Sequence, residues 1–147
     1  MDRRAARDAG VHRPTLPDAL GTGLAGPYTR GVPIYEFDVR TADDILWNVE
    51  CDARTGLVSE LEREVAPDDP AFADYRKIEE SDARATVLAI HPGSSVEATE
   101  YVVEQDGTAA YEFDLLTPYG DEMKIEVDAA TGEVTESNFE LWEIGVE

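Results

Sequence analysis

Side chains that could act as nucleophiles, bases or zinc ligands are scarce in this chain, which has two histidines and one cysteine. His12, His91 and Cys51 stand far apart, without the closely spaced ligand pairs that typify a zinc site. His91 precedes Pro92-Gly93, a pattern typical of a helix end, where it would cap the last carbonyl groups. We therefore expect a capping or surface role for His91.

Cys51 lies between Glu50 and Asp52, whose negative charges disfavour the thiolate that a reactive cysteine needs. In an internal repeat of the chain, Cys51 takes the place of Val127, which predicts a small apolar core residue. A single cysteine also excludes an internal disulfide.

Acidic pairs occur in predicted turns, at Asp43-Asp44, Asp68-Asp69 and Asp121-Glu122. None follows the Asp-x-Asp-x-Asp-Gly spacing of a calcium loop, so we expect loosely bound Na⁺ or K⁺ rather than a dedicated metal site. Glu36/Asp38 and Glu112/Asp114 alternate with aromatic residues, which explains them as the polar faces of strands. We predict no catalytic residue, no cofactor and no enzymatic activity.

The elements that position these residues repeat at a constant offset of 76 residues. Tyr35-Glu36-Phe37-Asp38 returns as Tyr111-Glu112-Phe113-Asp114, and the Asp52–Gly56 turn returns as Asp128–Gly132. Each turn combines an aspartate that caps its own backbone with a glycine that supplies a positive φ. The predicted structural turn residues are Asp52, Thr55, Gly56, Asp128, Thr131 and Gly132, together with Pro92 and Gly93 after a helix.

Alternation of apolar and polar residues predicts three strands in the first copy, from Ile34, from Ile45 and over 57–65. The second copy predicts a helix over about 79–90, followed by four strands that begin at Val96, Tyr111, Met123 and Val134. The offset would place the first copy's helix near residues 4–14, where Gly10 and Pro14 weaken it.

The predicted fold class is α+β, with tandem repeats in which a helix packs on an antiparallel sheet and the first helix is degenerate. We expect two similar sheets. The predicted organisation is an irregular basic arm at 1–31, a partial repeat at 32–66, an acidic proline-containing linker at 67–76, and a second repeat with an apolar C-terminal strand at 77–147.

The net charge of -21 comes from 33 acidic and 12 basic residues, and only Lys77 and Lys124 are lysines. Such an excess repels nucleic-acid phosphate and anionic lipid, so we expect neither as a partner. It resembles the composition of proteins from salt-accumulating halophiles. With no predicted signal or membrane-spanning segment, we expect a cytoplasmic protein or a virus-particle component rather than a secreted one.

The second copy resembles the PepSY family. The resemblance lies in Ile78–Ala83, in Ala89-Ile90-His91-Pro92-Gly93, in Tyr111–Asp114 and in Val127–Val134, and it covers about residues 77–136. Residues 34–58 resemble a second, partial unit. The resemblance implies a small α+β fold with a binding role and no catalysis, as in propeptides that inhibit or chaperone secreted metalloproteases.

The partner we expect is another protein, either a copy of this chain or a larger assembly. The favoured reading is a non-catalytic binding or structural module from a halophile; a subunit of a halophilic virus particle and a metalloprotease inhibitor or chaperone are the alternatives. The candidate partner contacts are Arg3, Arg4, Arg7 and Arg13 in the arm, and Phe139, Leu141, Trp142 and Ile144 in the tail. The same tail residues could instead cover the sheet.

Overall fold

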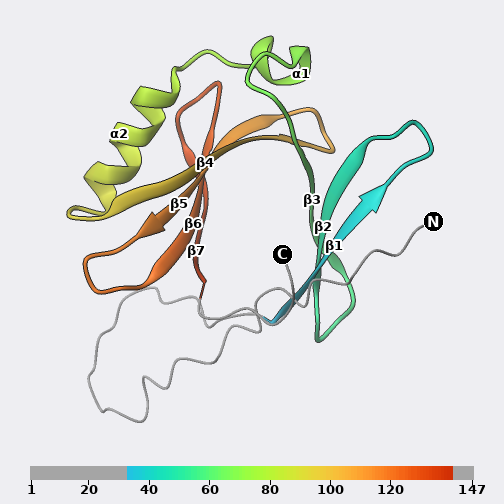
Figure 1. Cartoon of the computed structure of the whole chain (residues 1–147), viewed down its shortest axis with the longest axis horizontal. Helices are drawn as coiled ribbons and strands as arrows, with labels where there is room; N and C mark the ends of the chain where they lie inside the picture. Colours follow the sequence, from blue (N-terminus) through green and yellow to red (C-terminus); the bar gives the residue numbers. More distant parts are fainter. Residues whose placement is uncertain (1–32, 141–147) are drawn as a thin grey trace.

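The computed structural model describes residues 33–140, whose strands form one antiparallel sheet (Figure 1). The strands are β1 (Ile34–Arg40), β2 (Leu46–Asp52), β3 (Val58–Glu64), β4 (Ser95–Glu104), β5 (Ala109–Leu116), β6 (Glu122–Asp128) and β7 (Val134–Glu140). They pair in chain order from β1 to β7. Helices α1 (Pro70–Ala73) and α2 (Glu80–Ile90) lie between β3 and β4. The predicted α+β class, with a helix on an antiparallel sheet, is confirmed.

The expectation of two separate sheets is wrong, because β3 and β4 pair with each other. Their register joins Glu62 to Glu104, Arg63 to Val103 and Glu64 to Val102. Two separate sheets would each have left an unpaired edge at this point, and the pairing satisfies part of both edges. The repeat therefore predicts the strands correctly and their association incorrectly.

The segment predicted as a linker contains α1 and a residue of the hydrophobic core. Asp69 caps α1, since its Oδ1 accepts a hydrogen bond from the backbone N–H of Ala71 at 2.9 Å, and Pro70 opens the helix. Phe72 is fully buried and meets the rings of Tyr101 and Tyr111 edge-on, with centroid distances of 5.1 and 5.2 Å. This segment is part of the folded domain.

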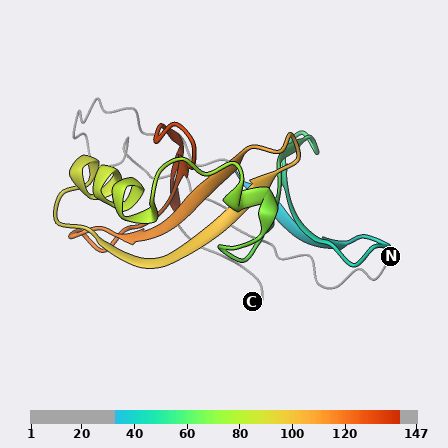
Figure 2. The same ribbon diagram turned by 90° about the horizontal axis from the view of Figure 1, so that it is seen from above.

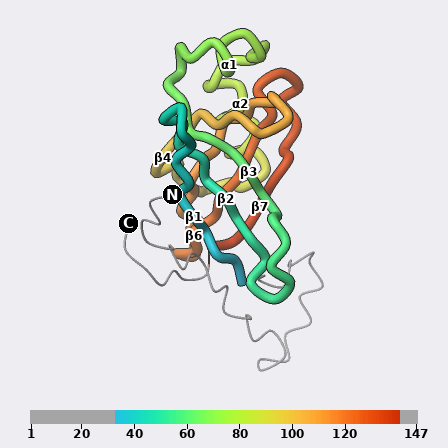
Figure 3. The backbone as a smooth tube through the Cα atoms, turned by 90° about the vertical axis from the view of Figure 1, so that its right-hand side faces the viewer, coloured from blue at the N-terminus to red at the C-terminus, as the bar shows by residue number. Residues whose placement is uncertain are grey.

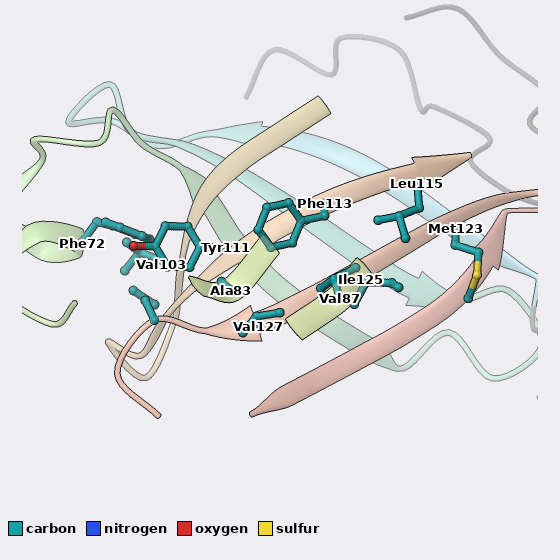
Figure 4. Close-up of a cluster of buried hydrophobic side chains, with 12 residues drawn as sticks. Phe72, Ala83, Val87, Val103, Tyr111, Phe113, Leu115, Met123, Ile125 and Val127 are labelled. Carbon is teal, nitrogen blue, oxygen red and sulfur yellow. The ribbon is translucent and has the colours of Figure 1, made fainter. Parts of the chain in front are cut away.

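Helix α2 covers one face of β4–β7 (Figure 2). Ala83 and Val87 are its buried residues, and they face the apolar positions of the strands (Figure 4). On the strands, the same core comprises Val103, Ala109, Tyr111, Phe113, Leu115, Met123, Ile125 and Val127. The Tyr111 hydroxyl donates to the carbonyl oxygen of Ile78 at 2.7 Å, which ties the start of the helical segment to β5.

Helix α2 ends where the sequence places its stop signal. The backbone N–H of His91 donates to the Val87 carbonyl at 2.9 Å, so His91 caps the helix through its backbone. Gly93 follows with a φ of +84°, and a side chain there would come to 3.5 Å of Pro118. That distance is an ordinary van der Waals contact, so the turn favours glycine for its backbone conformation alone.

The two hairpin turns of the repeat have matching hydrogen bonds. Asp128 Oδ1 accepts from the backbone N–H groups of Ala130 and Thr131 at 2.8 and 2.7 Å. Asp52 Oδ1 accepts from the two equivalent N–H groups of its own turn at 2.7 and 3.2 Å. Gly56 and Gly132 have φ values of +71° and +76°. The recurring motif thus builds the same turn twice.

Strand register also repeats at the 76-residue offset. The pairs Tyr35↔Cys51, Phe37↔Val49 and Val39↔Trp47 correspond to Tyr111↔Val127, Phe113↔Ile125 and Leu115↔Met123. The register shift between Glu50 and Cys51 corresponds to the shift between Glu126 and Val127.

The copies differ in what covers their apolar faces. Tyr35 and Val39 are 42% and 38% exposed, whereas their counterparts Tyr111 and Leu115 are 0% and 1% exposed. The first copy's predicted helix, near residues 4–14, lies outside the described residues.

Candidate functional site

The sheet is strongly curled, which brings the polar faces of its two halves together. Lys124 on β6 lies within 4 Å of carboxylates on β2 and β3, although β3 is three strands away in the sheet order. Adjacent strands are about 4.8 Å apart, so three intervals in a flat sheet would span about 14 Å. Figure 3, which looks from the side of β1–β3 toward β6 and β7, shows these strands overlying one another.

Lys124 sits at the centre of this curled face. Its Nζ lies 3.1 Å from Glu112 Oε2, 3.6 Å from Glu60 Oε2, 3.7 Å from Glu50 Oε1 and 3.8 Å from Glu62 Oε1. The lysine side chain is 14% exposed, and none of the four glutamate side chains exceeds 13%. We call these residues, together with Glu104, Glu126 and Glu136, the carboxylate cluster.

The cluster combines one ammonium group, one carboxylate whose pKa is lowered and six acids whose pKa values are raised. Burial lowers the pKa of Lys124, but the surrounding carboxylates outweigh burial and raise it well above its usual value. Burial raises the pKa of Glu60, yet Lys124 and hydrogen bonds from neighbouring carboxyl groups outweigh it, so the pKa is lowered. Lys124 and Glu60 therefore carry opposite charges at neutral pH.

The other members of the cluster have raised pKa values, with burial as the largest cause. The pKa is about 7 for Glu104, Glu112 and Glu136, about 8 for Glu50, about 9 for Glu62 and about 10 for Glu126. One ammonium group cannot neutralise seven carboxylates, so most of them retain a proton at neutral pH.

On one side of the cluster, residues 33–140 supply no basic group. No ion pair within 4.0 Å joins Glu104 or Glu126 to a basic group of the described residues. Glu126 is 4% exposed, and its Oε1 is buried without a hydrogen-bond partner. One carboxylate oxygen from each of Glu60, Glu62, Glu104 and Glu126 lies within 4.8 Å of the others. A pocket of about 500 Å³, lined in part by Glu60, Glu104 and Glu126, reaches this side.

Sequence reasoning missed the cluster, because each glutamate fits the polar face of a half-buried strand. The repeat held a signal, since Glu36, Glu50 and Glu60 recur at the same offset as Glu112, Glu126 and Glu136. Asn48 occupies the position of Lys124 and donates a hydrogen bond to Glu36, the counterpart of Glu112. Only the curl of the sheet shows that these side chains converge and are buried.

The residues singled out in the sequence lie apart from this cluster. Cys51 is a half-buried free thiol on the apolar face of β2. Phe139 is partly buried and packs against the core of the second copy, as the covering alternative predicts, and its role as a partner contact stays a prediction. The arm residues Arg3, Arg4, Arg7 and Arg13, and the tail residues Leu141, Trp142 and Ile144, lie outside the described residues.

The paired acids of the turns are separated from one another and from the cluster. Asp44 pairs with Arg40 at 2.8 Å in the β1–β2 turn. Asp69 pairs with Arg63 at 3.7 Å beside α1. Within the described part of the chain, the carboxylate cluster is the one group of acids whose oxygens converge closely enough to hold a metal ion.

Chemically, this arrangement is suited to binding protons or cations. The cluster contains carboxyl groups and one ammonium group, without a histidine or cysteine to act as base or nucleophile, and His91 and Cys51 lie elsewhere in the described chain.

The family model for the PepSY domain, described as "Peptidase propeptide and YPEB domain", matches residues 77–138. Residues 77–138 are a PepSY domain. The resemblance predicted over about 77–136 is confirmed, and the match includes α2 and β4–β6.

The PepSY domain is a propeptide-type module, and modules of this class are generally non-catalytic. No curated protein and no solved structure matches the chain significantly. Neither α1 nor α2, the helices of residues 33–140, is long and apolar enough to cross a membrane.

Proposed function

We propose that this chain is a non-catalytic, protein-binding PepSY module in which β1–β3 form a second, partial PepSY unit. The matched turns, register pairs and register shifts at one constant offset support the second unit. The unit differs from the complete one in the absence of a covering helix within the described residues.

The partly exposed apolar face of β1–β3 is the proposed binding surface. It comprises Tyr35, Phe37, Val39, Trp47 and Val49, and the greater exposure of Tyr35 than of Tyr111 is the observation that supports it. Because α2 covers the equivalent face of the complete unit, the shape that fits is an amphipathic helix. The chain's net charge of -21 favours a helix whose polar side is basic. The proposed partner is therefore a protein that offers a basic amphipathic helix.

A helical peptide with an alanine–valine stripe and an arginine-rich polar side tests this surface by titration calorimetry against the full chain. We expect Tyr35→Glu to weaken peptide binding by roughly tenfold or more, because it places a charge within the apolar contact. Tyr119→Glu is the matched control, since Tyr119 is 90% exposed in the β5–β6 turn. Equal affinities of Tyr35→Glu and Tyr119→Glu would contradict the proposed surface. Loss of all wild-type binding in ~1 M NaCl would show that charge alone holds the peptide.

We also propose that the protein works at high salt. The observation that favours this is its acidic excess, with -21 on 147 residues. Mutual repulsion of exposed carboxylates destabilises the fold, and in ~1 M salt the Debye length falls to about 3 Å. We expect the melting temperature to rise steadily from ~0.1 M to ~2 M KCl, measured by circular dichroism. A constant melting temperature over this range would count against the halophilic origin.

A further inference from the structure

We propose that Glu60, Glu62, Glu104 and Glu126 form a binding site for one divalent cation of the size of Ca²⁺. The site lies on the polar side of the curled sheet, whereas the proposed protein-binding surface is the apolar face of β1–β3. This inference therefore stands independently of the proposed function.

The geometry of the four oxygens suits an ion of this size. One carboxylate oxygen from each glutamate lies within 4.8 Å of the other three. Ca²⁺ takes oxygen ligands at 2.3–2.6 Å, so two ligands on opposite sides of the ion stand about 4.6–5.2 Å apart. The separations of the four oxygens are therefore compatible with ligation of one shared ion.

Two of the four side chains carry a buried oxygen that no hydrogen bond satisfies. Glu62 and Glu126 are each 4% exposed, and Glu62 Oε2 and Glu126 Oε1 are buried without hydrogen-bond partners. A buried carboxylate oxygen without a partner is costly, so the site favours an additional positive group. Lys124 contacts Glu62 through the other oxygen, Oε1, at 3.8 Å, and it makes no ion pair within 4.0 Å with Glu126.

Protons are the competing occupants, and the number of converging oxygens favours a metal ion over them. A shared proton joins only two oxygens, so several protons would be needed to satisfy this set. A divalent cation contacts all four at once. The raised pKa values of Glu62 and Glu126 agree with a site that is held by protons when no cation is bound.

The ligand set distinguishes Ca²⁺ from Mg²⁺. Mg²⁺ requires a near-ideal octahedron, keeps several waters and usually takes only one or two carboxylates. Ca²⁺ accepts more oxygen ligands in a flexible geometry. The pocket of about 500 Å³ that borders Glu60, Glu104 and Glu126 supplies an entry path and room for water ligands.

Titration of CaCl₂ into the full, EDTA-treated chain at pH 8 tests the site by calorimetry. We expect one ion per chain, with protons released on binding, because the ligands must lose the protons they hold. The observed heat should therefore differ between buffers of different ionisation enthalpy. CaCl₂ should also raise the melting temperature more than NaCl of equal ionic strength or MgCl₂ does.

Glu62→Gln and Glu126→Gln keep the side-chain shape and remove one ligand charge, so we expect each to weaken Ca²⁺ binding by roughly tenfold or more. Both should fold, because glutamine resembles the protonated acid. Glu133→Gln is the control, since Glu133 is exposed in the β6–β7 turn. Affinities of Glu62→Gln and Glu126→Gln equal to wild type would overturn the proposal. So would a wild-type chain that mild acid stabilises but that binds no Ca²⁺ at pH 8, or one that Mg²⁺ stabilises more.

Discussion

Lys124→Met is expected to lower the free energy of unfolding by about 3–5 kcal/mol at pH 8, the usual cost of removing one partner from a buried ion pair. Among residues 33–140, Lys124 is the one residue whose ammonium group lies within 4.0 Å of Glu50, Glu60, Glu62 and Glu112. Without it, these carboxylates either stay ionised while buried or take up protons at pH 8, where a carboxyl group in water is ionised. Urea unfolding measured by tryptophan fluorescence gives the difference from wild type.

Lys77→Met is the matched control, because Lys77 is the other lysine of the chain and is exposed. Both substitutions change the net charge equally, so a general effect of charge would lower stability equally in the two variants. We expect Lys77→Met to change the free energy of unfolding by less than about 0.5 kcal/mol. At pH 5 the loss caused by Lys124→Met should shrink, since Glu50, Glu62 and Glu112 are then protonated in the folded protein and Glu60, whose pKa is lowered, keeps its charge. A loss that is the same at pH 5 and pH 8 would show that packing of the lysine stem matters more than its charge.

The sequence predicts the strands well because their signals are local. Alternation of apolar and polar residues sets each strand, and the Asp-x-x-Thr-Gly motif sets the hairpins at Asp52 and Asp128. Helix α2 is likewise read from its acidic start and its Pro92-Gly93 stop. These patterns depend on neighbours in the sequence, so no knowledge of the tertiary arrangement is needed.

The features that the sequence did not predict depend on long-range geometry. Phe72 lies between prolines and acidic residues that favour a linker, and it becomes a core residue because it reaches Tyr101 and Tyr111. The single sheet depends on three pairs between β3 and β4, which no local pattern encodes. The cluster around Lys124 depends on the curl of that sheet. Each of its glutamates alone looks like an ordinary surface residue of a strand.

The stability of this protein is expected to fall as pH rises from about 5 to about 9, which is opposite to the behaviour of proteins stabilised by ionised carboxylates. A carboxyl group whose pKa is raised in the folded state holds a proton that the unfolded chain releases. Its contribution is fully present below the unfolded pKa and is lost as pH rises through the folded pKa. The groups with raised values between about 7 and about 10 are Glu50, Glu62, Glu104, Glu112, Glu126 and Glu136.

Acidic groups with lowered pKa values make the stability fall at low pH. Asp52, Asp106 and Asp128 accept hydrogen bonds within their turns, and the pKa of each is lowered. Their contribution is present above the unfolded pKa and is lost as pH falls through the folded pKa. Together, the two sets of groups place the maximum of stability near pH 4.5–5, roughly the pKa of an unperturbed carboxyl group.

Glu126→Gln isolates one group of the set, because glutamine cannot ionise. While wild type holds the Glu126 proton in the folded state and loses it on unfolding, this group contributes a slope of about 1.4 kcal/mol per pH unit. We expect Glu126→Gln to flatten the fall in stability by about this amount between pH 6 and pH 8, measured by urea unfolding in EDTA at constant ionic strength. Glu133→Gln should leave the slope unchanged, since Glu133 is exposed. Equal slopes for Glu126→Gln and wild type would mean that Glu126 is ionised in the folded protein. The side of the cluster that contains Glu104 and Glu126 would then have to hold a cation even in EDTA, or be open to water.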